Sequence, residues 1–316
     1  MKLIKVGAAV LNQTPLDWDG NLGRIERALD LARDDGVSIL CLPELCIPGY
    51  GCDDFYQSPG VQETSLELLA ELLPKTRGMV VSLGVPVQYR KALFNCVAVA
   101  CDGELLGFAA KQHLAGDGLY YEPRWFKSWP ERRVSEIRFQ GAPAPIGDLV
   151  FGAGGVTLGL EICEEAWVSR RPGSSLAARG VDLVLNPSAS HFAFGKQRIR
   201  RRFVLEGSRA FGVTYVFSNL LGNSSGRMIF DGGAMVATEG RLVAEGPRFS
   251  FEDVLLTSAT VDVDATRLRQ VRTGSFVPEF ETHPGELAVG PGSFAFPDLE
   301  RGQEAPRVEA GDEPAG

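Results

Sequence analysis

The stretch "GLEICEEAW", residues 159–167, ends an apolar run on a cysteine and places three glutamates around it. The longer run "GGVTLGLEIC" (154–163) has the apolar and β-branched residues of a buried strand. We therefore expect Cys163 where a strand turns sharply into a loop or helix, which exposes a thiol at the edge of a sheet. Packing is the alternative interpretation, since free cysteine is among the most buried residue types, and it is our interpretation of the other five cysteines.

Strand-like and helix-like segments alternate on both sides of this stretch. Apolar runs predict strands over 3–11, 37–45, 79–87, 154–163, 181–189, 213–221 and 255–264. Apolar stripes at helical spacing predict helices over 21–36, 61–76 and 196–212. Two hairpins are expected over 93–111, with an Asp-Gly turn, and over 228–246. This mixture predicts an α/β fold of layered sheets covered by helices within one domain.

The last part of the chain has a different composition. From about residue 285 the sequence is dominated by glycine, proline and acidic residues, with few apolar side chains that could anchor a core. The sequence therefore predicts a domain over residues 1–270 and a partly disordered linker or tail over residues 271–316.

Composition excludes several classes of protein. The formal net charge of −8 repels nucleic acid and anionic membranes at long range, and no apolar stretch approaches the ~18–20 residues of a membrane span. The first residues also lack the pattern of a secretory signal, so we expect a cytoplasmic protein without a nucleic-acid or membrane partner. Six cysteines with no C-x-x-C pair and three histidines indicate neither a disulfide framework nor a zinc site. The basic stretch "KQRIRRRF" (196–203) is interpreted as a solvated helix face or a subunit contact.

A cysteine hydrolase needs a base for the thiol proton and a cation or hydrogen-bond donors for the oxyanion. A buried carboxylate can be that base, because burial raises its pKa toward that of the thiol. Glu44 ends an apolar strand before a Pro-Gly turn, and Lys111 ends the second strand of the first hairpin. Taken singly, Glu44 is equally well interpreted as a solvated loop residue and Lys111 is better interpreted as a surface lysine, so their combination with Cys163 carries the hypothesis.

Glutamate, lysine and cysteine at three strand ends, in this order, resemble the catalytic triad of the nitrilase superfamily. Five motifs between about residues 5 and 265 resemble the glutaminase domain of glutamine-dependent NAD synthetases: "LPELCIPGYGC", "KQHLAGDGLYYEPRWF", "GLEICEEAW", "NPSASH" and "FDGGAMVATEG". The resemblance implies a four-layer αββα sandwich that assembles into a homo-oligomer across helix faces.

The resemblance also implies the catalytic roles. Cys163 is expected to be the nucleophile, Glu44 the general base, and Lys111 the cation that orients the pair and stabilises the oxyanion. Glu122, in "YYEPRWF", matches a second glutamate that lies close to the lysine. Glu161, beside the cysteine in sequence, is expected to serve the loop and not the sulfur.

Five further residues are expected to bind substrate. Ser190, Lys196 and Tyr120 match positions where the family contacts glutamine, although some members have arginine at the position of Lys196, which replaces a point charge by a bidentate fork. Glu164 could receive the α-ammonium group. Trp167 could form a wall of the pocket or belong to the core.

Three functions are compared. The first is a glutamine amidohydrolase that acts through a cysteine thioester and supplies ammonia for amidation of deamido-NAD by a synthetase domain or subunit. The second is a free-standing amidase acting on another small ω-amide. The third is a non-catalytic binding or scaffold subunit, against which the intact triad argues. The Ser-Gly-Gly-x-Asp-Ser loop of the synthetase half, Walker motifs and GxGxxG are absent from the sequence, so we expect no cofactor and no metal.

Overall fold

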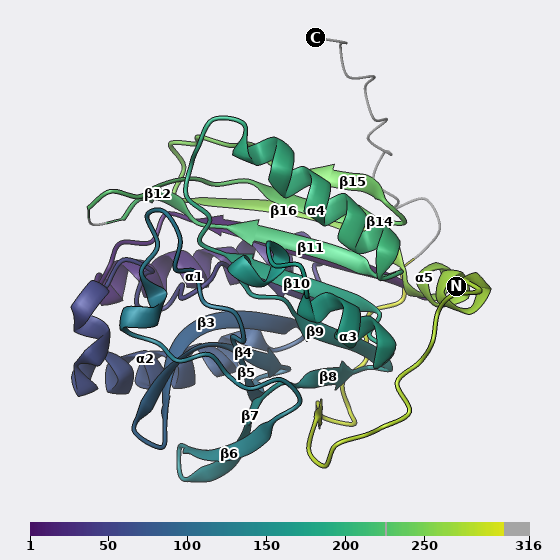
Figure 1. The fold of residues 1–316 in the computed structure, drawn as a ribbon, viewed down its shortest axis with the longest axis horizontal. Helices are drawn as coiled ribbons and strands as arrows, with labels where there is room; N and C mark the ends of the chain where they lie inside the picture. The colour runs from purple at the N-terminus through teal and green to yellow at the C-terminus, as the bar shows by residue number, and fades with distance from the viewer. Residues whose placement is uncertain (225, 300–316) are drawn as a thin grey trace.

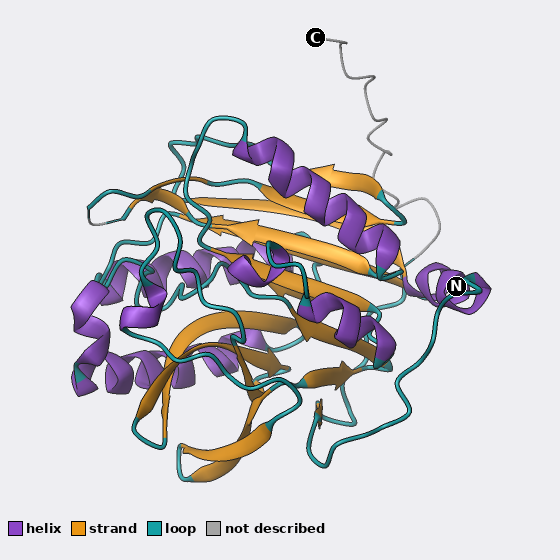
Figure 2. Cartoon of the chain, in the orientation of Figure 1, coloured by secondary structure: helices purple, strands orange, loops and turns teal. Residues whose placement is uncertain are grey.

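The computed structural model describes residues 1–224 and 226–299 of the chain. In this part, two large β-sheets pack face to face, and helices lie on their outer faces (Figures 1 and 2). The first sheet has the order β16-β1-β2-β3-β4-β5-β7-β6 and the second the order β15-β14-β11-β10-β9-β8-β17. A small ribbon of β12 and β13 lies beside them.

The bounds of the elements are as follows. The first sheet comprises β1 (Leu3–Leu11), β2 (Ile39–Cys41), β3 (Val80–Tyr89), β4 (Ala92–Cys101), β5 (Glu104–Ala110), β6 (Val134–Phe139), β7 (Ala142–Gly147) and β16 (Val254–Asp262). The other strands are β8 (Val150–Ala153), β9 (Val156–Leu160), β10 (Leu183–Ser188), β11 (Thr214–Asn219), β12 (Leu221–Asn223), β13 (Ile229–Asp231), β14 (Ala234–Thr238), β15 (Arg241–Glu245) and β17 (Leu287–Val289). The helices are α1 (Trp18–Asp34), α2 (Pro59–Leu72), α3 (Pro172–Ala178), α4 (Lys196–Ala210) and α5 (Val263–Arg272), with 3₁₀ turns η1 (Asp53–Gln57), η2 (Leu73–Thr76), η3 (Glu122–Arg124) and η4 (Cys163–Ala166).

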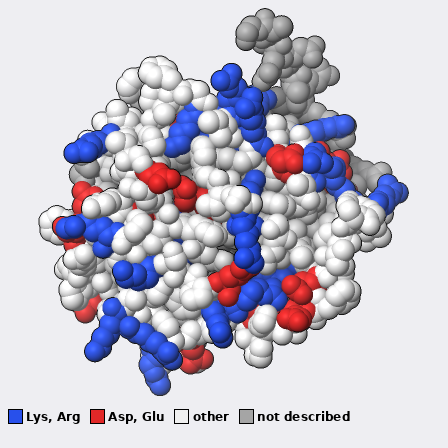
Figure 3. Space-filling view, in the orientation of Figure 1, with Lys and Arg blue, Asp and Glu red and all other residues white. Residues whose placement is uncertain are grey.

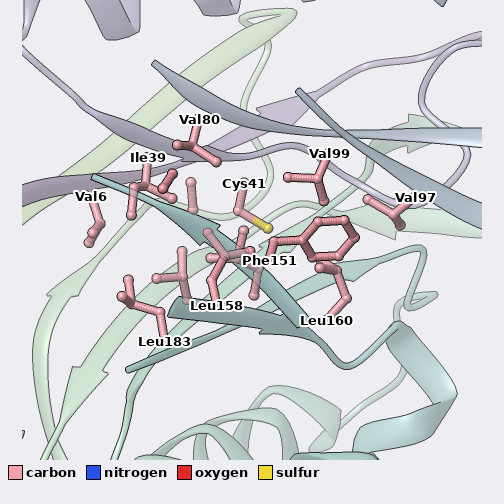
Figure 4. Close-up of a cluster of buried hydrophobic side chains, with 14 of the residues drawn as sticks. Val6, Ile39, Cys41, Val80, Val97, Val99, Phe151, Leu158, Leu160 and Leu183 are labelled. Carbon is pink, nitrogen blue, oxygen red and sulfur yellow. The ribbon is translucent and has the colours of Figure 1, made fainter. Parts of the chain in front are cut away.

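The space between the two sheets is filled by one apolar cluster. Val6 and Val97 of the first sheet meet Phe151, Leu158 and Leu183 of the second, and all five are buried (Figure 4). Each such side chain contributes about 1.5–3 kcal/mol by leaving water. Because the central strands are covered on both faces, their sequences are continuous apolar runs without a polar alternation.

The outer faces of the sheets are covered by two pairs of helices. Helices α1 and α2 pack against the first sheet through Ile25 and Leu69, and helices α3 and α4 pack against the second through Leu176 and Val204. The order of layers is helix, sheet, sheet, helix. The predicted α/β class and the αββα sandwich are therefore confirmed.

The strand predicted over 37–45 is shorter than expected. The ladder of β2 ends at Cys41, and the chain then turns through a buried loop in which Leu45 has a φ of 47° and Gly49 a φ of 84°. This loop lies directly on β3 at Gly84, where a Cβ would be 2.1 Å from the Leu45 nitrogen. Glycine at position 84 therefore permits the close approach that places residue 44 inside the molecule.

Several elements differ from the prediction or were not predicted. Helix α1 begins at Trp18, three residues earlier than expected, because Asp17 caps it by accepting the Gly20 N–H at 3.2 Å. The sequence did not indicate β6, β7, β8, α3 or α5. The division at residue 270 stays a prediction. Beyond it, β17 pairs with β8 in parallel and Ala288 is buried, while the part of the predicted tail over 300–316 lies outside the described residues.

Two surface properties bear on the expected partners. Within residues 1–224 and 226–299, no helix has both the length and the apolar character to cross a bilayer. On the face drawn in Figure 3, acidic and basic side chains are intermixed.

Candidate active site

Glu44 lies in the buried loop that follows β2, and its side chain is fully buried. Its Oε1 accepts the Lys111 ammonium at 2.6 Å and the Asn95 amide at 2.8 Å. Its Oε2 accepts the backbone N–H of Ala189 at 3.0 Å. The carboxylate is thus held by donors from β4, from the end of β5, and from the segment that follows β10, which belongs to the other sheet.

Lys111 follows the last residue of β5 and is also fully buried. Its Nζ donates to Glu44 and, at 2.9 Å, to Oε1 of Glu122. Burial lowers the pKa of Lys111, but the two carboxylates outweigh burial and hold the pKa well above its usual value. The lysine is therefore a permanent cation at neutral pH.

Glu122 stands at the start of η3 and completes the cluster. It accepts the Tyr50 hydroxyl at 2.6 Å and the Ala115 N–H at 3.1 Å, in addition to Lys111. Burial raises the pKa of Glu122, and Lys111 opposes that rise. A buried cation between two buried carboxylates needs such additional donors, since desolvation otherwise outweighs the attraction.

Cys163 begins η4, three residues after β9 ends at Leu160, so the strand is shorter than the predicted 154–163 but the predicted turn from strand to helix is observed. Its φ of 47° is unusual for a residue other than glycine, and strained backbone of this kind is common at functional sites. Burial raises the pKa of the Cys163 thiol well above its usual value. Glu44 and Glu122 raise the pKa further, whereas Lys111 and the Ala189 N–H lower it.

The two glutamates that flank Cys163 in sequence at positions 161 and 165 have different partners. Glu161 is buried in the second sheet, where it pairs with Arg171 at 2.6 Å and accepts the Gly173 N–H at 3.0 Å. These two partners lie at the start of α3, and the Tyr215 hydroxyl of β11 also donates to Glu161. Glu165 accepts the N–H of Ile162 at 2.6 Å and that of Gln112 at 2.5 Å, and burial raises its pKa to about 8. It connects the residue before the cysteine to the residue after the lysine.

The predicted substrate residues gather around the ammonium group of Lys196. This group lies 5.4 Å from the ring centroid of Tyr120, 5.2 Å from that of Trp167, and 3.1 Å from His191 Nδ1. Burial lowers the pKa of Lys196 to about 8, and Cys163 and Glu164 act in the opposite direction. The pKa of half-buried Glu164 is raised by burial. Trp167 also packs against the core cluster of the second sheet and its ring meets that of Phe203, as its interpretation as a core residue requires. Its role as a wall of the pocket stays a prediction.

Ser190 is buried, and its position is set by a segment of three residues, 189–191. Its N–H donates to Asn219 Oδ1 at 2.7 Å, and its hydroxyl accepts from Nε of Arg200 at 3.1 Å. The interpretation of the basic stretch 196–203 as a solvated face is therefore wrong for Arg200, which is 0% exposed. Arg198, by contrast, is exposed.

The sequence did not single out Asn95, Tyr50 or Glu165 as parts of the site. Asn95 could have been noticed as a polar residue inside the apolar run "LFNCVAVA", where an amide requires a partner. Tyr50 carried no comparable signal, since its hydroxyl reaches a glutamate 72 positions away.

A cavity of about 550 Å³ lies beside the cluster. Tyr50 and Tyr120 line it, and their rings meet edge to face with centroids 6.2 Å apart. These tyrosines also contact Glu122 and the segment 189–191, respectively. The cavity therefore adjoins the candidate catalytic residues. Nowhere in the described part of the chain do three histidine, cysteine, aspartate or glutamate side chains form a group that could hold a metal ion.

An αββα sandwich with a buried glutamate, lysine and cysteine cluster between its sheets is the architecture of carbon-nitrogen hydrolases. The family model for carbon-nitrogen hydrolases matches residues 5–273. The chain belongs to this family.

Within the family, the chain is similar to glutamine-dependent NAD(+) synthetases. It is 33% identical to the enzyme of Mus musculus over 275 residues, which are 84% of this chain and 38% of the relative. A crystal structure of a glutamine-dependent NAD(+) synthetase from Cytophaga hutchinsonii is 42% identical, with a TM-score of 0.78, over 82% of this chain and 43% of that one. An amidase from Nesterenkonia sp. shares the fold, with 20% identity and a TM-score of 0.67 over 84% of this chain and 92% of that one. The chain spans less than half of the length of the synthetases that it matches.

Proposed function

We propose that this protein hydrolyses the side-chain amide of L-glutamine and supplies the ammonia to a synthetase domain or subunit that amidates deamido-NAD. The observation that carries the proposal is the cluster of Glu44, Lys111 and Glu122 at the Cys163 thiol, all four fully or almost fully buried. The similarity to glutamine-dependent NAD(+) synthetases supports the choice of substrate. Assembly as a homo-oligomer and a cytoplasmic location remain predictions.

The first half of the proposed reaction forms a thioester. Glu44 takes the thiol proton while the Cys163 sulfur forms a bond to the amide carbon, and the carbonyl π electrons move to the oxygen. The Lys111 ammonium stabilises that oxyanion, together with the backbone N–H of Glu164 in the first turn of η4. Collapse of the oxyanion breaks the carbon–nitrogen bond, and the departing nitrogen takes the proton from Glu44 and leaves as ammonia.

The second half regenerates the enzyme. Glu44, again ionised, takes a proton from water as the water oxygen attacks the thioester carbon. The carbon–sulfur bond then breaks, the sulfur recovers the proton from Glu44, and glutamate is released. The raised pKa of Cys163 fits this order of events, since the thiol is protonated at rest and is ionised only during attack.

Selection of glutamine is assigned to the residues around Lys196. We assign the α-carboxylate of glutamine to the ammonium of Lys196 and to the hydroxyl of Ser190, and the α-ammonium of glutamine to the carboxylate of Glu164. Tyr120 and Trp167 form the walls that keep Lys196 oriented through their π faces. This pairing predicts that amides without an α-carboxylate bind poorly.

The test compares ammonia release from L-glutamine and from propionamide by the wild-type protein, Cys163→Ala and Cys101→Ala. Cys101 is a matched control because it is a buried thiol at the other end of β4 from Asn95. We expect glutamine to be preferred, Cys163→Ala to be inactive and Cys101→Ala to be active. Preference for the simple amide would favour the free-standing amidase, and absence of turnover in every case would favour the non-catalytic subunit.

Covalent labelling gives an independent measurement. The glutamine analogue 6-diazo-5-oxo-norleucine should form one adduct, located on Cys163 by mass spectrometry, and excess L-glutamine should slow its formation. Labelling of a different cysteine would contradict the assignment of the nucleophile.

A further inference from the structure

Arg200 of helix α4 is a fully buried arginine that contacts the segment 189–191. Its Nη2 donates to the carbonyl of Ser190 at 2.6 Å and to that of His191 at 2.8 Å, and its Nε donates to the Ser190 hydroxyl at 3.1 Å. Its Nη1 lies 2.9 Å from both carboxylate oxygens of Asp231, which is also fully buried. These five contacts, together with a longer one from Nη1 to Gln197 Oε1 at 3.5 Å, fix the position of the guanidinium.

The same segment contacts the candidate catalytic residues on its other side. The Ala189 N–H donates to Oε2 of Glu44 at 3.0 Å and also lowers the pKa of Cys163. The Tyr120 hydroxyl donates to the Ala189 carbonyl at 3.0 Å and accepts the His191 N–H at 2.8 Å. A displacement of the segment would therefore change the surroundings of Glu44, Cys163 and Tyr120 together.

Arg200, which contacts the segment 189–191, forms a cluster with Asp231 and Arg248 that carries a net positive charge. Asp231 also accepts Nε of Arg248 at 2.7 Å, so two guanidinium groups share one carboxylate. The positive charge of Arg200 also acts on Lys196 and lowers the pKa of that lysine. Because the Ser190 hydroxyl accepts from Arg200, its own hydrogen remains to be donated. The net positive charge and the available Ser190 hydrogen both favour binding of an anionic group of the substrate.

We propose that Arg200 is a positioning residue for the glutaminase reaction and a determinant of its preference for substrates with a carboxylate; this inference rests on the function proposed above. Arg200 holds the Ala189 N–H on Glu44 and Cys163, and its bond to the Ser190 hydroxyl leaves that hydroxyl as a donor for the substrate carboxylate. A lysine at this position would carry the charge but could not make the planar set of contacts to two carbonyls, a hydroxyl and a carboxylate.

The test uses Arg200→Lys, with Arg198→Lys as the matched control on the exposed face of the same helix. We expect Arg200→Lys to fold, as judged by its melting temperature, and to lose about 10²-fold in kcat/KM for glutamine, since a displacement of about 1 Å at a reacting group has this effect. The loss for propionamide, which has no carboxylate to recognise, should be smaller. Arg198→Lys should resemble the wild type.

A second measurement does not depend on the substrate. The rate of Cys163 alkylation by iodoacetamide, followed against pH by mass spectrometry, should show a higher apparent thiol pKa in Arg200→Lys, because the Ala189 N–H no longer stabilises the thiolate. If wild-type protein alkylates normally but does not hydrolyse glutamine, the proposed function fails while this profile still tests the positioning role.

An Arg200→Lys protein with the kcat/KM and the alkylation profile of Arg198→Lys would overturn the proposal. If Arg200→Lys does not fold, Arg200→Gln is measured in the same way and the same two outcomes apply. If neither variant folds, Arg200→Ala is prepared with guanidinium present during refolding. If added guanidinium lowers the apparent pKa of the Cys163 thiol in folded Arg200→Ala to the wild-type value, the positioning role is supported. A folded protein whose thiol pKa does not respond to guanidinium contradicts that role.

Discussion

Replacing Glu44 by glutamine removes the proposed base and leaves the size of the side chain unchanged. In the wild-type protein, all three contacts to the carboxylate are made by donors: the Lys111 ammonium, the Asn95 amide and the Ala189 N–H. Glutamine has one acceptor oxygen and one NH₂ group. In either orientation, the NH₂ group must face a donor, so one buried contact is lost as well as the charge.

The magnitude follows from these contacts. Loss of a positioned general base lowers the rate by about 10²–10⁴-fold, which is about 2.7–5.4 kcal/mol in the barrier. A buried donor without an acceptor costs a further ~1–3 kcal/mol of folding free energy. We therefore expect Glu44→Gln to fold with a lower melting temperature and to lose at least about 10²-fold in kcat for glutamine.

The assay is ammonia release under saturating glutamine, with mass spectrometry of the protein to detect a thioester. Glu104→Gln is the control, because Glu104 is an exposed glutamate on β5, the same strand that leads to Lys111. A Glu44→Gln protein that keeps more than a tenth of the wild-type kcat would refute the assignment of the base.

Three further predictions concern charge. Alkylation of Cys163 should follow a thiol pKa above that of a free cysteine, and a value below it would contradict ionisation by Glu44 during attack. KM for glutamine should rise above pH 8, where Lys196 loses its proton, and Lys196→Arg should abolish the rise; a flat KM in the wild type would count against the carboxylate contact. Lys111→Met should reduce the free energy of unfolding by about 3–5 kcal/mol at pH 8. This deficit should shrink at pH 5, because burial raises the pKa of Glu122 and the carboxylate left without Lys111 then binds a proton in the folded state. A difference in urea midpoint between the variant and the wild type that is equal at both pH values would refute the prediction.

Much of the fold could be predicted because both faces of the central strands are covered, which makes runs such as 181–189 continuously apolar. Strands and helices were missed where a segment lacks such an apolar run or is too short to show a period. Strand β7 contains Pro143 and Pro145, which normally argue against a strand. They are tolerated because β7 pairs with β5 only through Ile146 and Gly147, beyond both prolines. Helix α3 has seven residues, too few to establish a helical period.

Some residues of the candidate site could be predicted from the sequence and others could not. Glu44, Lys111 and Cys163 lie one to three residues after the ends of strands, where the sequence pattern and the family resemblance point to the same positions. Arg200 gave a weaker local signal: it occupies the apolar stripe of α4 with Phe203, Val204 and Gly207, and this periodicity could have indicated burial. Its partner Asp231 lies 31 positions away, and no local pattern in the sequence connects the two.

Glu44 and Lys111 follow strands of one sheet, whereas Cys163 and Ala189 follow strands of the other. The distances between the proposed catalytic residues are therefore set by how the two sheets dock, and neither sheet contains the complete proposed set. A partly loosened state that keeps both sheets but relaxes the apolar layer between them would retain its far-UV circular dichroism and lose turnover. On heating, inactivation should accordingly precede the loss of secondary structure, which makes enzymatic activity a sensitive reporter of tertiary docking in this chain.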